Sequence, residues 1–165
     1  MNRRPLIAVA ALLVWPLGKA PQPANPGTLS VGLTVPSVCT IAGATLDFGA
    51  STEGPIASQA SATVSCNQGQ PWRISANSGL HSTTGTRQLR AGSGSSVPYL
   101  LFIDEAMSVE MGDGELAGTY PSGSPIHGIG TGQQQSVPIF GLVPIFDSGL
   151  PAGEYTDEIL LTVHF

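Results

Sequence analysis

Residues 28–35 read TLSVGLTV, and their apolar side chains fall at every second position. This alternation is the period of a β-strand with one apolar face. Pro26-Gly27 and Pro36 flank the stretch and separate it from the sequence that follows. We therefore expect a strand that can be given to a partner, although it can also be an ordinary first strand of its own domain. The side chains expected to be inserted are Leu29, Val31, Leu33 and Val35.

The composition favours a single all-β domain. The 165 residues include 21 Gly and 14 Pro, only 10% are charged, and no stretch beyond residue 24 keeps a helical apolar spacing. Short apolar runs separated by turn clusters are typical of a β-sandwich, here of about seven or eight strands. The expected strands are residues 38–41, 45–48, 61–66, 72–76, 87–90, 97–103, 136–143 and 154–165.

Residues 1–24 have the pattern of a secretory signal peptide. Arg3 and Arg4 precede an apolar segment that is too short to span a bilayer, and small residues follow it. The pattern leaves the cut site open between Ala20 and Ala24, and an uncleaved anchor is the alternative. We expect the chain to be exported.

Removal of this leader leaves an acidic chain without lysine. Three arginines then stand against eleven acids, which gives a net charge of −8. Such a surface does not attract phosphate backbones, so we expect no nucleic-acid partner. Arg87 and Arg90 are expected at the surface, in ordinary ion pairs.

Cys39 and Cys66 are predicted to form a disulfide. An exported chain reaches an oxidising compartment, and no second cysteine or histidine pair lies at the spacing of a metal site. Closing a loop of about 28 residues stabilises a fold by about 3.5 kcal/mol when chain entropy dominates.

Catalytic and metal-binding patterns are absent from the sequence. His81, His127 and His164 are scattered, and no nucleophile elbow, phosphate loop or calcium loop is present. We expect no enzyme activity, no metal and no cofactor.

Trp72 is expected in the core, and the Tyr155 hydroxyl is expected to be hydrogen-bonded.

The sequence ends with a second alternating run. Because no strand follows it, we expect it to lie at an open sheet edge that recruits another strand. The apolar residues predicted for this groove-edge strand are Ile159, Leu161, Val163 and Phe165.

Several motifs, in their order and spacing, resemble the spore coat protein U domain family, and within it the pilins of archaic, Csu-type chaperone–usher pili. They are residues 28–39, TLDFG (45–49), VSC (64–66), VPYLLFID (97–104), VPIFG (137–141) and PAGEYTD (151–157) with the strand that follows.

The resemblance implies an incomplete immunoglobulin-like β-sandwich that a donor strand from a neighbouring subunit completes. Residues 25–36 would form the donor segment and residues 37–165 the pilin-type domain. The implied partners are a periplasmic chaperone, an outer-membrane usher and identical or related pilin subunits. The implied function is a structural subunit of a cell-surface fibre that supports adhesion and biofilm formation. A carbohydrate- or surface-binding adhesin module and a non-pilus coat or matrix protein are the alternatives.

Overall fold

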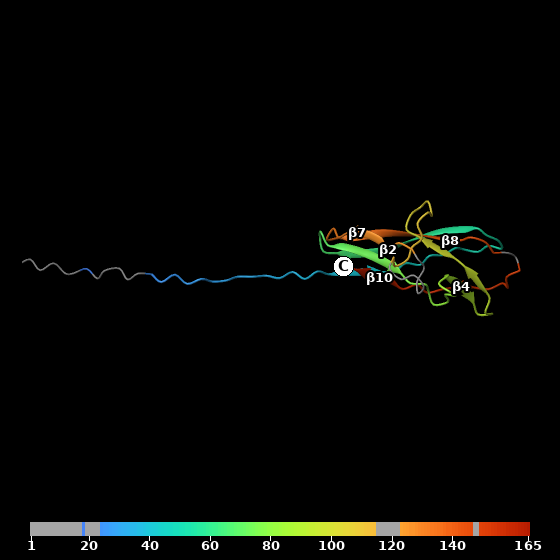
Figure 1. Cartoon of the computed structure of the whole chain (residues 1–165), viewed down its shortest axis with the longest axis horizontal. Coiled ribbons are helices and arrows are strands. Elements are labelled where there is room, and N and C mark those ends of the chain that lie inside the picture. The colour runs from blue at the N-terminus through green and yellow to red at the C-terminus, as the bar shows by residue number, and fades with distance from the viewer. Residues whose placement is uncertain (1–17, 19–23, 115–122, 147–148) are drawn as a thin grey trace, which may run out of the picture. The chain divides into compact units, whose positions relative to one another are not determined.

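The computed structural model describes residue 18 and residues 24–114, 123–146 and 149–165 (Figure 1). The predicted signal peptide lies outside the described residues except for residues 18 and 24. The chain divides into two compact units, residues 1–34 and 35–165. Residues 24–34 of the first unit form no regular secondary structure. Among the described residues we find no apolar helix of membrane-spanning length.

The second unit contains ten strands in its described part, and all pairings between them are antiparallel. The all-β prediction is therefore confirmed. The strands are β1 (Cys39–Ala42), β2 (Ile56–Cys66), β3 (Pro71–Ala76), β4 (Gln88–Ala91), β5 (Ser96–Pro98), β6 (Leu100–Phe102), β7 (Ile126–Ile129), β8 (Gln134–Val143), β9 (Tyr155–Thr156) and β10 (Leu161–His164).

The strands form three sheets, with orders β1-β2-β8-β6, β10-β3-β7 and β5-β4-β9. The core lies between the first two sheets, because the buried side chains of β2 and β8 belong to one cluster with those of β3. Trp72 is buried in this core, as expected. The Tyr155 hydroxyl donates a hydrogen bond to the Pro151 carbonyl over 2.9 Å, which also agrees with the prediction.

Within the described residues, ten strands are present where about seven or eight were expected. The run 97–103 is divided at Tyr99, whose N–H donates to the Arg87 carbonyl while the next residues join β8. The chain passes there from the third sheet to the first. The run 154–165 is likewise divided into β9 and β10, and β7 was not expected.

Residues 45–48 were predicted to be a strand, but they form none. Their side chains still pack inward, because Leu46 and Phe48 lie against the core cluster. A Cβ atom at Gly141 of β8 would come within 2.9 Å of both side chains, so glycine lets Leu46 and Phe48 lie directly against the backbone of β8. The segment is therefore anchored by its side chains rather than by a backbone ladder.

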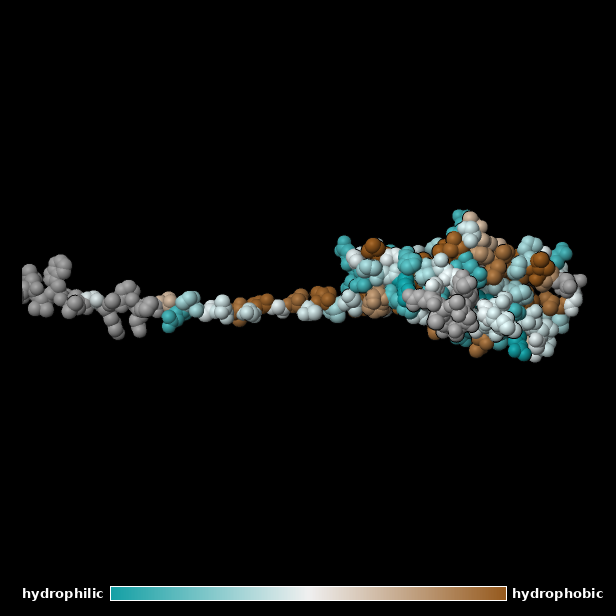
Figure 2. Space-filling view, viewed as in Figure 1, coloured by the Kyte–Doolittle hydropathy of each residue, from teal (hydrophilic) through white to brown (hydrophobic). Residues whose placement is uncertain are grey.

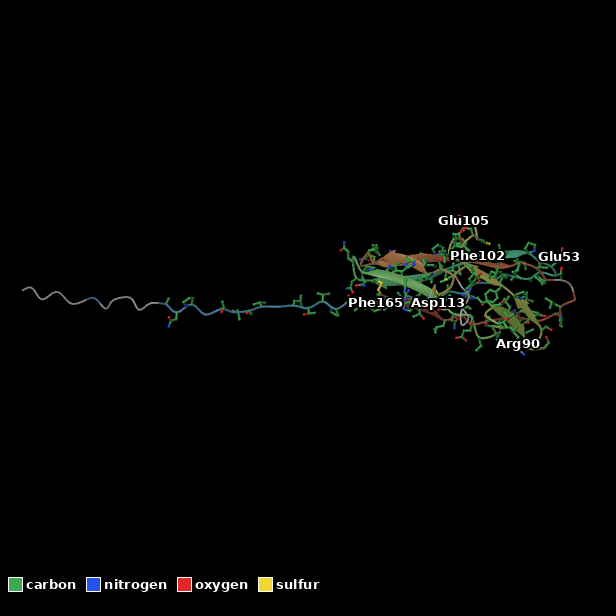
Figure 3. All side chains as sticks on the ribbon, in the orientation of Figure 1. Glu53, Arg90, Phe102, Glu105, Asp113 and Phe165 are labelled. Atoms are coloured by element: carbon green, nitrogen blue, oxygen red, sulfur yellow. A yellow bond between two sulfur atoms is a disulfide. The ribbon has the colours of Figure 1, made fainter. Side chains whose placement is uncertain are left out.

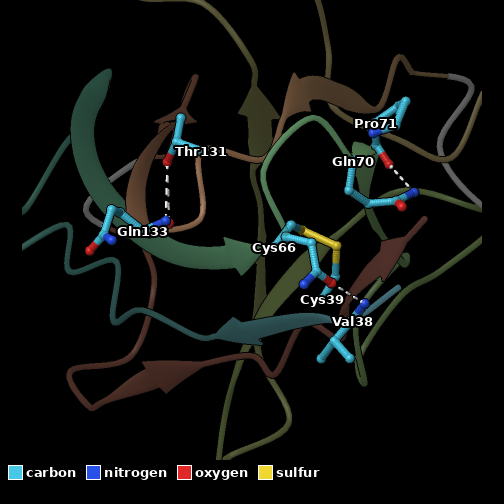
Figure 4. Close-up of a disulfide and its surroundings, with 8 residues drawn as sticks. Val38, Cys39, Cys66, Gln70, Pro71, Thr131 and Gln133 are labelled. Atoms are coloured by element: carbon cyan, nitrogen blue, oxygen red, sulfur yellow. Dashed lines mark hydrogen bonds between the residues drawn. A yellow bond between two sulfur atoms is a disulfide. The ribbon is translucent and has the colours of Figure 1, made fainter. Parts of the chain in front are cut away.

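Cys39 and Cys66 form the predicted disulfide (Figure 4). The two residues are directly opposite in the β1–β2 register, so the bond joins the start of β1 to the end of β2. The Val38 N–H donates to Asn67 Oδ1 over 2.6 Å, and the Asn67 N–H returns a bond to the Val38 carbonyl over 3.2 Å. These contacts hold β1 firmly along one edge.

Candidate functional site: a groove between two unpaired strand edges

The candidate site begins with two strand edges. Among the described strands, β1 pairs with β2 alone and β10 pairs with β3 alone. The two strands lie near each other without forming a ladder. Each therefore presents a row of backbone N–H and C=O groups that can pair with an added strand.

A groove of about 410 Å³ lies between these edges, and we call it the β1–β10 groove. Most of the side chains on its two walls are apolar, and Glu158 is an acidic exception on the side of β10. Ile41, Leu46 and Phe48 line it on the side of β1, and Ile159 and Leu161 line it on the side of β10. All five side chains are only partly buried, so a chain placed in the groove would remove them further from water.

The floor of the β1–β10 groove comes from strands that are distant in the sequence. Ala60 of β2, Leu101 of β6 and Ile139 of β8 contribute from the first sheet, and Leu89 contributes from β4. The first and third sheets therefore meet beneath the groove. The hydrophobic surface that it offers is continuous with the core of the domain.

One end of the groove is polar. The Tyr99 hydroxyl donates to Asp157 Oδ2 over 2.7 Å, and the His81 backbone N–H donates to Asp157 Oδ1 over 3.0 Å. His81 Nδ1 lies 3.3 Å from the same Oδ1 atom, and the Asp157 side chain is buried. This network fixes the chain just before β10 and thereby the position of the groove wall.

Arg87 lies behind this polar end and is 1% exposed. The prediction that it forms a surface ion pair is wrong. Its guanidinium donates to the carbonyls of Ala76, Asn77 and Met111 over 2.9–3.2 Å. Burial lowers the pKa of Arg87, and the nearby acidic groups oppose this effect.

Burial also raises the pKa of the Tyr99 hydroxyl well above its ordinary value, and the hydrogen bond to Asp157 acts in the same direction. The folded state therefore holds this proton at pH values where the unfolded chain releases it. The associated stability is complete below about pH 10 and falls as the pH rises further, by up to about 1.4 kcal/mol per pH unit.

We expect Tyr99→Phe to remove this contribution to the pH dependence. Urea unfolding followed between about pH 9 and about pH 11 should show a shallower decline for the variant than for the parent chain. Equal slopes for the two proteins would contradict the assignment of the buried proton to Tyr99.

The predicted donor residues are exposed. Leu29, Val31, Leu33 and Val35 have exposed fractions of 88%, 87%, 90% and 71%. Figure 2 shows apolar atoms at intervals along residues 24–34, as the alternating sequence requires. Four large apolar side chains in water are unfavourable, which is consistent with a segment that is buried in another state.

The predicted groove-edge residues fall into three environments. Ile159 and Leu161 line the β1–β10 groove, and Val163 packs against the core cluster. Phe165 is 57% exposed and does not line the groove. Sequence reasoning missed the floor residues and the polar end at Tyr99 and Asp157. Of these residues, only Asp157 could have been suspected from the sequence, because it lies just before the alternating apolar run that begins at Ile159.

Among the described residues, no group of three or more His, Cys, Asp or Glu side chains is placed to hold a metal ion. His81 belongs to the polar end of the groove, whereas His127 and His164 lie on β7 and β10.

The fold and the groove define a small all-β sandwich domain with an unfilled position between two strand edges. Residues 25–162 match the model of the Spore Coat Protein U domain family, and the chain belongs to this family. The predicted family resemblance is therefore confirmed. No match was found among curated proteins.

The structure is also similar to a chain in the crystal structure of the CsuC–CsuE chaperone–tip adhesion subunit pre-assembly complex from archaic chaperone–usher Csu pili of Acinetobacter baumannii. The TM-score is 0.54 and the sequence identity is 24%. The similarity covers 80% of this chain and 40% of the solved chain, so the present chain spans two fifths of its neighbour's length. This likeness shows a shared fold.

Proposed function

We propose that the protein is a structural subunit of a cell-surface fibre assembled by strand donation. The β1–β10 groove of one subunit is filled by residues 28–35 of the next subunit. The observation that carries this proposal is the pairing of an apolar groove between two free strand edges with an exposed, alternating apolar segment in the same chain.

The alternating segment suits the groove because its side chains are apolar, like the groove, and recur at the two-residue period of a strand. Side chains at every second position enter the apolar groove, while the peptide groups between them pair with β1 and β10. Burial of four such side chains contributes about 6 to 12 kcal/mol. This range is comparable to the stability of a whole domain, so the joint between subunits should open slowly.

Assembly through a chaperone–usher pathway is part of the proposal. Family membership and the similarity to a subunit that was solved with its chaperone support a periplasmic chaperone, which protects the groove before polymerisation. An outer-membrane usher and identical or related subunits are the other partners. Residues 1–24 direct export, and the finished fibre supports adhesion and biofilm formation.

A fibre-tip adhesion subunit is the second candidate, because the solved neighbour is described as one. A shaft position is favoured here by the exposed donor segment, since a subunit at the tip has no earlier subunit to complete. A coat or matrix protein joined by the same strand donation is a variant of the first candidate.

The experiment is an SDS gel, unheated and boiled, of protein recovered from the periplasm. We expect a ladder of multimers that collapses on boiling, and we expect Leu33→Asp to abolish it, because a buried carboxylate without a partner costs several kcal/mol. Ser30→Asp is the matched control, since it places the same charge on the opposite face of the segment and should leave the ladder intact.

A monomer in every lane would contradict strand donation, as would a ladder that survives Leu33→Asp. A ladder that is lost equally in both variants would indicate that the segment is sensitive to any charge and would overturn the assigned inward face.

A further inference from the structure

The open edge of β1 presents its backbone groups at alternate residues. The N–H and carbonyl of Val38 both bond to Asn67, which directly follows β2, so they point away from the open edge (Figure 4). The Cα atoms of Cys39 and Cys66 are 4.2 Å apart, which is close to the spacing of an antiparallel pair without backbone hydrogen bonds. The backbone groups of Cys39 therefore face the β1–β10 groove, and those of Ile41 do so two residues later.

The donor segment directly precedes β1, so it can enter the groove of its own chain only as a hairpin with β1. Cys39 and Ile41 are the inward-facing residues of β1. Directly opposed residues share a face, so Val35 must lie opposite Cys39 if all four apolar side chains are to enter the groove. A register that moves the segment by one residue turns its polar face inward. A register that moves it by two residues leaves Val35 in the loop.

Complete self-insertion therefore requires a three-residue hairpin loop of Pro36, Ser37 and Val38. The common loop of this length is a type I turn followed by a residue in the left-handed conformation. Pro36 suits the first position of the turn, but Val38 falls on the left-handed position. A positive φ is an outlier for a β-branched residue, and among the described non-glycine residues only Thr84 and Met107 have one. Val38 therefore opposes this loop.

The two walls of the groove also run in opposite directions. β1 begins opposite the end of β2, and β10 ends near the start of β3. A turn at residues 67–70 joins β2 to β3, so both points lie at one end of the domain. Phe165 directly follows β10 and marks this end in Figure 3, where Glu53 lies at the other end. A hairpin with β1 would place the segment parallel to β10, which is the slightly less stable pairing, whereas a segment from another chain can run antiparallel to β10.

We propose that Val38 and Asn67, which we call the β1 clamp, keep the donor segment out of its own groove, so that a second copy of this chain supplies residues 28–35. This inference rests on the proposed strand donation and names the residues that decide which chain fills the groove. The segment of a second copy closes no loop at Val38. It can insert all four apolar side chains while the clamp keeps both of its hydrogen bonds.

The experiment compares the chain recovered from the periplasm with a Val38→Gly/Asn67→Ala double variant, in which position 38 tolerates a positive φ and loses its side-chain acceptor. Hydrogen exchange of the monomeric fraction, followed by mass spectrometry, reports whether residues 28–35 are paired. We expect fast exchange in the parent monomer and at least about tenfold slower exchange in the variant. The variant should also give at least about tenfold less multimer on the unheated SDS gel, because its own segment fills its groove.

Two control variants separate the conformation of position 38 from the flexibility of the loop. Val38→Thr keeps a β-branched side chain at the left-handed position and should behave as the parent does. Ser37→Gly loosens the same loop without supplying a left-handed residue at position 38, and it should also behave as the parent does. Exchange that slows equally in Ser37→Gly and in the double variant would overturn the inference, because flexibility alone would then explain the insertion.

Failure of strand donation is distinguishable from failure of the clamp, because exchange is measured on monomers. A parent chain without a ladder contradicts the proposed function, and the exchange comparison still tests the clamp. Slow exchange of residues 28–35 in the parent monomer would overturn the inference. Fast exchange in the double variant, at a thermal unfolding midpoint no lower than the parent's, would do the same. A lower midpoint transfers the test to Val38→Asn, which tolerates a positive φ and leaves Asn67 in place; fast exchange there equally overturns the inference.

Discussion

Co-expression of a Leu33→Asp chain with a Leu161→Asp chain should yield an SDS-resistant dimer and no longer species. The first chain keeps its β1–β10 groove and loses its donor strand, whereas the second keeps its donor strand and loses its groove wall. Strand donation is a head-to-tail contact in which the two surfaces differ, so one competent joint forms and then ends the chain. Each variant expressed alone should remain monomeric.

A matched control is available on β10. Thr162 is exposed on the opposite face, and Thr162→Asp should leave the full ladder of multimers in place. Mass spectrometry of the dimer band identifies both chains, and their ratio should be one to one. A full ladder from the mixture would show that multimers form through another surface, and two monomers would show that no strand is exchanged.

Arg87→Met should lower the free energy of unfolding by about 3 to 5 kcal/mol. The variant leaves the carbonyls of Ala76, Asn77 and Met111 without their common donor inside the domain. Each unsatisfied buried acceptor costs about 1 to 3 kcal/mol. Such a loss is a large fraction of the stability of a domain of this size.

Urea unfolding reports this loss through the fluorescence of Trp72, which is buried in the core. Arg87→Lys should be intermediate, because one ammonium group cannot reach all three carbonyls. Arg90→Met removes an exposed arginine from β4 and should change stability by no more than about 0.5 kcal/mol. Equal effects at the two arginines would contradict the structural role of Arg87.

Several features could be predicted from local patterns alone. The alternation of residues 28–35 is a property of eight neighbouring residues, and its exposed apolar side chains agree with that pattern. The disulfide followed from having two cysteines in a chain expected to be exported. The role of the donor residues and of Ile159, Leu161, Val163 and Phe165 stays a prediction until the variants are measured.

Other features depended on contacts that no local pattern contains. Residues 97–103 look like one strand, but Tyr99 lies where the chain passes between sheets. Residues 45–48 have the composition of a strand, yet their backbone forms no ladder. Arg87 carries the sequence signature of a surface residue because its acceptors lie 10, 11 and 24 positions away.

The sequence by itself determined the all-β class, the alternating segment of residues 28–35 and the pairing of Cys39 with Cys66, since each rests on residue type and short-range spacing. The tertiary structure alone decided the β1–β10 groove and its polar end. These arise from long-range contacts, which bring together residues as far apart as Tyr99 and Asp157. Periodicity reveals which face of a strand is apolar, but the neighbour across that face is set by long-range pairing.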